Sequence, residues 1–337
     1  MAEIQISKYD RRSYLNQKPA KKTKFRSRED NMPQEILTGE KLARAAAADF
    51  RNFFYPFTGP SIKICVEAAN YPCVRGSGSN ARIVIPNEMA EEVIDTPDKL
   101  HFHLLIIGHE IAHLVHKHCD RKDRDKAESR SVEYWADFYG AKVMMTLITY
   151  GEKIGMIYRP FYTGQSKLEK ALNSMGIAVG RLVESIYVEH VLYPAPAERV
   201  SLVSNGITSF LRHELAGKVH SPGWMISVPM RILFGAPATR RLMNDPEKIS
   251  NDLSLIKGAR RRHLEVQGEK TAIIPGLKPR LQPILSLSYT ISYAEMERGR
   301  RQTWEELDRL AVELGEPDLF KEAKSSWSTK ELLEIVT

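Results

Sequence analysis

Apolar residues recur every three to four positions along much of the chain, which is the spacing of a helix with one buried face. The most apolar stretch of this kind runs from about 98 to 118, and a second runs from about 127 to 149. Two shorter runs rich in β-branched residues read as strands. The pattern therefore predicts an α+β protein, with helices at 40–54, 98–118, 127–149 and 166–191 and from 196 onward, and with strands at 61–67 and 81–85.

The most apolar helix contains the sequence Gly108-His109-Glu110-Ile111-Ala112-His113, an H-E-x-x-H pattern. Residues four apart lie on one helical face, so His109 and His113 can direct their imidazoles at a single ion. Glu110, one step round the helix, can reach a water molecule held by that ion. Two nitrogen ligands, an activated water and a carboxylate base are the arrangement of zinc hydrolases.

A catalytic zinc ion usually has three protein ligands, so the next helix should supply one more. Glu133 and Asp137 lie four apart on that helix, with Ala136 leaving room for close packing. We expect Glu133 to be the third ligand and Asp137 to orient a ligand histidine. Glu128 is the competing ligand, and an exposed surface carboxylate is the ordinary role of a helical glutamate.

These residues carry a family resemblance. H-E-x-x-H at 109–113 followed by E-x-x-A-D at 133–137 resembles the gluzincin metallopeptidases, in particular the M48-like pattern. Tyr193-Pro194 with Arg199 is similar to a Thr-His-Pro-x-x-x-x-Arg stretch of that group, although Tyr193 stands where the family has His. The similarity covers about 60–205. It implies a zincin-like core, in which a small mixed sheet packs on the active-site helices, and a soluble zinc endopeptidase that acts on an intracellular protein.

The resemblance also implies a mechanism. Glu110 would accept a proton from a zinc-activated water and pass it to the leaving amine. Tyr193 and His190 are the two candidates for a hydrogen-bond donor to the developing oxyanion, and an ordinary half-buried tyrosine fits position 193 equally well. The run at 82–86 ends in Pro86, which suits an edge strand with which a substrate peptide could pair, although an ordinary strand of the sheet fits as well.

The remaining histidines and the cysteines have no clear partners in the sequence. His116 lies too far along the helix to bind the same ion as His109. It could line the cleft, although a polar position on a partly exposed helix is its ordinary interpretation. Cys65, Cys73 and Cys119 are an odd number without a disulfide framework, which is typical of a reducing cytosol. We therefore expect a cytoplasmic protein.

Charge is concentrated at the N-terminus of this chain of 337 residues with net charge +7. Residues 1–30 hold nine Lys or Arg against four acidic residues and lack the apolar segment of a secretory signal. We expect a flexible basic tail, which is ordinarily solvated. The more specific hypothesis is that it is attracted to nucleic acid or to an acidic partner. The apolar run of the active-site helix is too short to span a membrane.

The sequence suggests three parts: the tail at 1–30, a zincin-like metallopeptidase domain at 31–220, and a separate helical region at 221–337 that recognises a substrate or partner. The basic clusters at 260–263 and 298–301 are expected to be solvated faces. The alternative function is a non-catalytic regulatory or nucleic-acid-binding protein that retains a gluzincin-like fold. Glu110 discriminates between the two, because a protein that only binds metal needs no base beside the ion.

Overall fold

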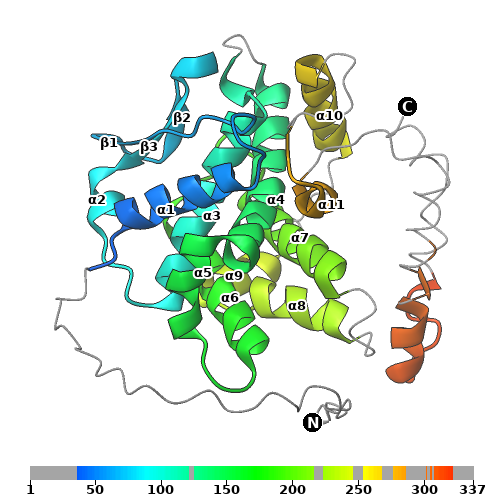
Figure 1. Ribbon diagram of the computed structural model, residues 1–337. Coiled ribbons are helices and arrows are strands. Elements are labelled where there is room, and N and C mark those ends of the chain that lie inside the picture. Colours follow the sequence, from blue (N-terminus) through cyan, green and yellow to red (C-terminus); the bar gives the residue numbers. More distant parts are fainter. Residues whose placement is uncertain are drawn as a thin grey trace, which may run out of the picture. The chain divides into compact units, whose positions relative to one another are not determined.

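The computed structural model describes residues 36–120, 125–215, 223–245, 253–267, 276–285, 301, 304–305 and 307–321. Within these residues the protein has the expected α+β fold, in which helices predominate and the single sheet has three strands (Figure 1). The chain divides into two units between Glu35 and Ile36. The basic tail expected at 1–30 lies outside the described residues.

The helices lie at or near the predicted positions in the first two thirds of the chain. In chain order they are α1 (Gly39–Asn52), α2 (Asn87–Glu91), α3 (Pro97–Val115), α4 (Lys126–Tyr150), α5 (Glu152–Tyr158), α6 (Lys167–Ser185), α7 (Pro196–Leu215), α8 (Trp224–Leu233), α9 (Pro237–Met243), α10 (Leu253–Gln267) and α11 (Gln282–Leu285). Short 3-10 turns lie at Gly78–Asn80, His118–Asp120, Arg159–Phe161 and Pro279–Leu281.

The sheet is small and mixed. It consists of β1 (Ile64–Glu67), β2 (Cys73–Arg75) and β3 (Arg82–Pro86) in the order β1-β3-β2. β1 is parallel to β3 and β2 is antiparallel to it. β3 is therefore the central strand, and the interpretation of 82–86 as an edge strand is wrong. Its proline is tolerated because it is the last residue of the strand, where the ladder ends.

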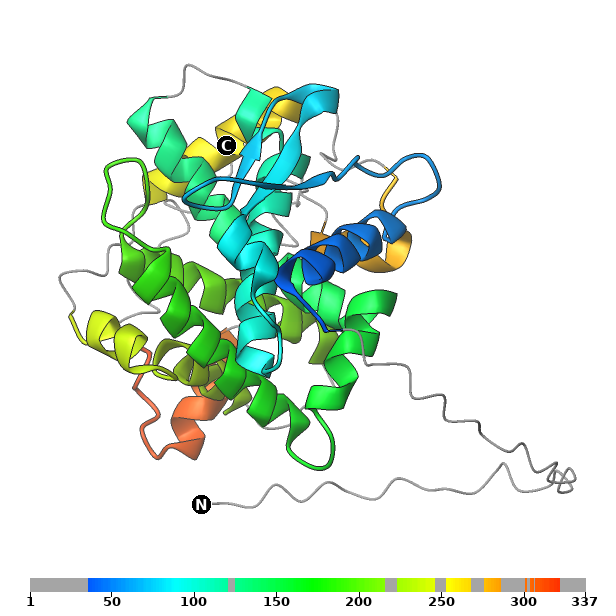
Figure 2. The same cartoon turned by 90° about the vertical axis from the view of Figure 1, so that its left-hand side faces the viewer.

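Helix α3 lies at the centre of the fold and packs against α1, α4, α6 and the sheet (Figures 1 and 2). The side chain of Thr96 caps its first turn by accepting from the amide of Lys99, and Pro97 follows at the first helical position. Most of its side chains are buried all round the helix. This burial on every side explains why its apolar run is nearly continuous and extends beyond the single buried face that the sequence predicted.

Helices α3 and α4 cross with their backbones in contact at Gly108 and Gly140. A Cβ atom added to Gly108 would lie 2.3 Å from the carbonyl oxygen of Gly140, and one added to Gly140 would lie 2.6 Å from the amide nitrogen of His109. No larger side chain fits either position without moving a helix. The crossing lies beside His109 and within two turns of Glu133, so it sets the spacing between the residues expected to bind metal.

Helix α6 ends at Ser185, earlier than the predicted end at 191. The amides of Ile186 and Tyr187 both donate to the carbonyl of Leu182, which closes the helix. The chain then runs without helical structure to Pro196, where α7 begins as predicted. This non-helical connection contains Tyr187, His190 and Tyr193.

Helices α8, α9 and α10 lie in the same compact unit as the helices before residue 220, whereas the sequence suggested a separate region from 221 onward. Helices α8 and α9 pack on α6 and α7, and α10 packs on α4. Of the cluster at 260–263, Arg262 and His263 are buried, so the expectation of a wholly solvated face is wrong there. Arg262 lies between Glu128 and the end of α3, which accounts for its burial.

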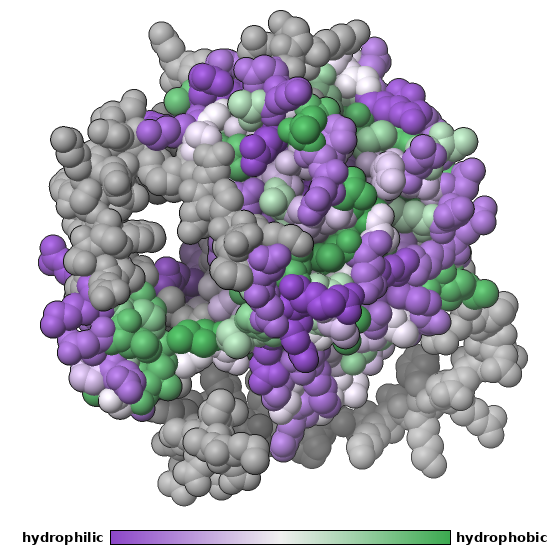
Figure 3. All heavy atoms as spheres, turned by 180° about the vertical axis from the view of Figure 1, so that it is seen from behind, coloured by the Kyte–Doolittle hydropathy of each residue, from purple (hydrophilic) through white to green (hydrophobic). Residues whose placement is uncertain are grey.

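None of the helices in the described part of the chain has the length and apolar character needed to cross a bilayer. Among the described residues seen in Figure 3, hydrophilic side chains predominate and hydrophobic ones form scattered patches.

Candidate metal centre

His109, His113 and Glu133 bring three donor groups together at the crossing of α3 and α4. The two Nε2 atoms are 3.0 Å apart, and the Glu133 carboxylate lies 3.2 Å from Nε2 of His109 and 3.4 Å from Nε2 of His113. In a tetrahedral site with zinc–nitrogen bonds of 2.0–2.1 Å, neighbouring ligand atoms are about 3.3–3.4 Å apart. The three donors therefore fit one divalent ion.

Glu133, and not its competitor Glu128, joins the two histidines. Glu128 lies in the first turn of α4, about a turn and a half before Glu133, and one of its carboxylate oxygens is 3.9 Å from the guanidinium of Arg262. It is absent from the metal-competent groups found among the described residues.

Asp137 holds the first histidine in place. Its Oδ1 atom lies 2.9 Å from Nδ1 of His109, and Arg199 donates to both carboxylate oxygens at 2.7 and 3.1 Å. The hydroxyl of Tyr187 donates to Oδ1 at 3.3 Å. A carboxylate on Nδ1 fixes the proton there and leaves the Nε2 lone pair for a metal, which is the orienting role expected for Asp137.

Opposite charges in this group stabilise one another. Burial opposes charge on His109, but the carboxylates of Asp137 and Glu133 outweigh it and raise the pKa of His109 to about 10. Burial raises the pKa of Glu133, but the two histidines outweigh this effect and hold it well below its ordinary value. Without an ion, a proton on His109 thus balances the carboxylates. A metal ion must displace that proton, so we expect its affinity to decrease in acid.

Glu110 lies beside the three donors without being one of them. Its side chain is buried, and burial raises its pKa, with a smaller contribution from Glu133 that the histidines oppose. A buried glutamate whose pKa is raised is suited to accept and return a proton.

A cavity of about 220 Å³ opens onto the donors. Glu110 lines it from α3, Cys73 and Val74 line it from β2, and Tyr187 and Tyr193 line it from the connection after α6. The carboxylate of Glu110, the metal-competent group (His109, His113 and Glu133) and the edge of the sheet therefore surround one cavity.

Of the two candidate oxyanion donors, only Tyr193 faces this cavity. His190 is exposed, its Nδ1 atom accepts from the amide of Leu192 at 3.2 Å, and it lines a separate surface pocket. Burial and the charge of Glu133 raise the pKa of Tyr193, so its hydroxyl keeps its proton and can donate.

Arg199, Tyr187 and His118 are functional candidates to which the sequence assigned no role. Arg199 was visible as part of the Tyr-Pro stretch, but nothing in the spacing identifies Asp137 as its partner. His116 is fully buried and does not line the cavity, so its expected place on a partly exposed face is wrong. His118 contacts His113 directly.

No family model, no curated protein and no solved structure matches this chain.

Proposed function

We propose that this protein is a zinc-dependent endopeptidase of the gluzincin type, with a zincin-like core that acts on an intracellular protein. The observation that carries the proposal is the spacing of His109, His113 and Glu133, whose donor atoms lie 3.0–3.4 Å apart as in a tetrahedral zinc site. The buried Glu110 in the same cavity supports an enzyme over a protein that only binds metal.

Zinc in such a site lowers the pKa of water and polarises a carbonyl oxygen. The chain's own groups supply the other steps. Glu110 accepts a proton from the attacking water at its carboxylate and returns it to the leaving amine. Tyr193 donates from its hydroxyl to the oxygen of the scissile carbonyl, at the position where charge develops. Asp137, held by Arg199, keeps His109 in the tautomer with its proton on Nδ1.

The sheet edge at the cavity suits an extended peptide. With β3 central, β2 is the edge strand on the side of the cavity, and its residues Cys73 and Val74 line that cavity. An extended substrate can pair with the free main-chain groups of an edge strand. A substrate strand would therefore pair with β2, in place of the run at 82–86.

The first experiment measures the metal content of purified protein by elemental analysis, with wild type beside Glu133→Ala. We expect about one zinc per chain in wild type and little in the variant, because two ligands hold zinc much more weakly than three. No zinc in wild-type protein after reconstitution would overturn the proposal.

The second experiment separates catalysis from binding. Glu110→Gln should keep its zinc and lose hydrolysis of a fluorogenic peptide library, because the amide cannot accept the proton. Glu184→Gln, the same change at an exposed position of α6, should behave as wild type. Cleavage that persists in Glu110→Gln would show that Glu110 is not the base, or that a contaminating protease is responsible.

A further inference from the structure

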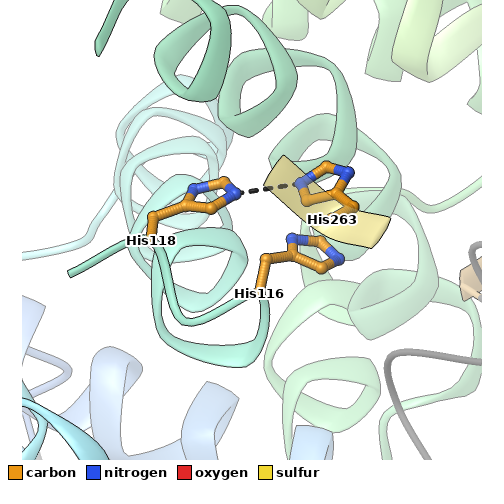
Figure 4. A group of neighbouring side chains, drawn as sticks. All are labelled: His116, His118 and His263. Atoms are coloured by element: carbon orange, nitrogen blue, oxygen red, sulfur yellow. Dashed lines mark hydrogen bonds between the residues drawn. The ribbon is translucent and has the colours of Figure 1, made fainter. Parts of the chain in front are cut away.

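Three histidines beyond the metal-competent group form a second cluster (Figure 4). His116 follows the last turn of α3, His118 begins the 3-10 turn after it, and His263 comes from α10. All three side chains are 0 % exposed. Buried polar groups are retained where they have partners or a function, so this cluster needs an explanation.

His118 connects the ligand His113 to α10. Its Nδ1 atom lies 2.9 Å from Nδ1 of His113, and its Nε2 atom lies 3.0 Å from Nε2 of His263. Both distances are those of hydrogen bonds. His113 thus has a buried partner on Nδ1, just as His109 has Asp137.

The backbone at the end of α3 makes this contact. Lys117 has φ of 53°, in the left-handed region that residues other than glycine seldom adopt. This turn reverses the chain so that His118 faces back toward His113. The guanidinium of Arg262 donates to the carbonyl of Lys117 at 3.2 Å, which fastens α10 to the same turn and places His263 beside His118.

Ring geometry separates the hydrogen-bonded pair from the metal-competent pair. The Nε2 atoms are 3.0 Å apart in both, but the ring centroids are 4.7 Å apart for His109 and His113 and 5.3 Å apart for His118 and His263. The shorter centroid distance means that the first two rings are tilted away from the line between their Nε2 atoms, as the rings of two ligands of one ion must be. The second pair meets head-on with ring planes only 12° apart, as in an N–H···N hydrogen bond.

The order of protons along the chain of rings follows from His113. A neutral imidazole has one N–H and one lone pair, and the Nε2 atom of His113 must present its lone pair to the metal or, without one, to the N–H of His109. Its proton therefore lies on Nδ1 and donates to Nδ1 of His118. His118 then carries its proton on Nε2 and donates to His263, whose ring is neutral because burial and Arg262 lower its pKa to about 3.

We infer that His118 and His263 are positioning residues for His113, through hydrogen bonds directed from His113 to His118 and from His118 to His263. The inference rests on the proposed metal site at His109, His113 and Glu133. The two ligand histidines then have different supports: a carboxylate with an arginine holds His109, and a chain of neutral imidazoles anchored on α10 holds His113.

A second metal ion is the competing explanation, because donor atoms of His116, His118 and His263 lie within 4.8 Å of one another. An ion on Nε2 of His118 would move its proton to Nδ1, where it would face the proton of His113 across 2.9 Å. While these rings stay neutral, a metal ion at His109, His113 and Glu133 therefore excludes a second ion at His116, His118 and His263. The head-on geometry of His118 and His263 and the adjacent charge of Arg262 also disfavour a cation there.

The experiment compares zinc affinity, by chelator competition, in wild type and in leucine variants of two neighbouring buried histidines. His118→Leu should weaken zinc binding about 10- to 100-fold, the usual cost of losing an outer hydrogen-bond partner. His116→Leu is the matched control and should stay close to wild type, because neither ring nitrogen of His116 has a hydrogen-bond partner within the described residues. His118→Asn should recover part of the loss, since its Oδ1 takes the place of the acceptor Nδ1.

Three results would overturn the inference. The first is an equal loss of affinity in both leucine variants, which would indicate a merely structural role. The second is two zinc ions per wild-type chain with one lost in His116→Leu, which would establish the second metal site.

The third result comes from NMR of protein labelled with ¹⁵N-histidine, which reads the tautomers without metal or activity. We expect the proton on Nε2 in His118 and on Nδ1 in His113, and the opposite assignment would refute the proposed order. If wild-type protein binds no metal, the proposed function fails, while these spectra still decide the hydrogen-bond order.

Discussion

Replacing Asp137 by Asn tests how the fold and the candidate site depend on one buried charge. The Asp137 and Arg199 side chains are 2 % and 5 % exposed, and their closest atoms are 2.7 Å apart. Asn has the same shape but no charge, so the variant leaves the arginine buried without its counter-ion.

The expected loss is about 3 kcal/mol in the free energy of unfolding of the metal-free protein. Removing one partner of a buried ion pair costs about 3–5 kcal/mol. The lower end applies because the amide oxygen still accepts a hydrogen bond and because the guanidinium of Arg199 keeps its place 4.0 Å over the ring of Tyr187. Zinc affinity should also decrease about 10- to 100-fold, since His109 loses its orienting carboxylate.

The assay is urea denaturation of EDTA-treated protein, followed by circular dichroism. Glu40→Gln is the control, since Glu40 pairs with Arg44 on an exposed face of α1 and should change stability by less than about 0.5 kcal/mol. The double variant Asp137→Asn with Arg199→Met should be more stable than the sum of the single changes predicts, because it removes the unpaired charge as well. A cost below about 1 kcal/mol for Asp137→Asn, or full additivity in the double variant, would refute the reasoning.

Three further predictions concern the helix crossing, an ion pair and the metal. Gly140→Ala should destabilise the protein by about 1–3 kcal/mol and weaken zinc binding, because the added Cβ atom has no room against α3. The control is Gly155→Ala, whose added Cβ atom would lie 3.9 Å from its nearest neighbour and should leave the free energy of unfolding unchanged in the same denaturation assay. Glu92→Gln should lower the free energy of unfolding at neutral pH by about 1–2 kcal/mol, a range already reduced for solvent screening. The reason is that the effect of burial is outweighed by the hydrogen bonds from Arg181, which help to lower the pKa of Glu92 to about 2. This contribution is complete above the ordinary pKa of 4.5 and is lost as the pH falls toward 2, so an unchanged difference between variant and wild type across that range would contradict it. Zinc at 100 times its Kd should stabilise the metal-free wild type by about 2.7 kcal/mol in thermal unfolding but leave Glu133→Ala unaffected, and equal stabilisation of both proteins would place the metal elsewhere.

The parts that the sequence predicted are those with a local cause. The spacing of His109, Glu110 and His113 follows from helical periodicity alone, and the apolar runs place α3, α4 and the start of α7 to within a few residues. The α+β class follows in the same way. Glu133 was favoured over Glu128 because it lies four residues before Asp137 on one helical face, and the family resemblance supported the same choice.

Other features depend on contacts between distant segments, which no local pattern encodes. β2 has three residues, too few for an alternating pattern, and its pairing makes β3 the central strand. Tyr193 and His190 were equal candidates for the oxyanion donor in the sequence. Only the path of the chain after α6 shows that Tyr193 faces the cavity and His190 does not. His263 reads as part of an exposed basic cluster, yet the packing of α10 on α4 buries it.

The sequence by itself determined that two imidazoles and a carboxylate base lie on one apolar helix, because a helix fixes the directions of residues three and four apart. Only the tertiary structure decided which groups surround them: Arg199 against Asp137, Tyr193 in the cavity and His118 against His113. The physical reason is that these contacts depend on the packing of α7 on α4, on the path of the chain after α6 and on the turn at Lys117, which bring groups from separate elements together.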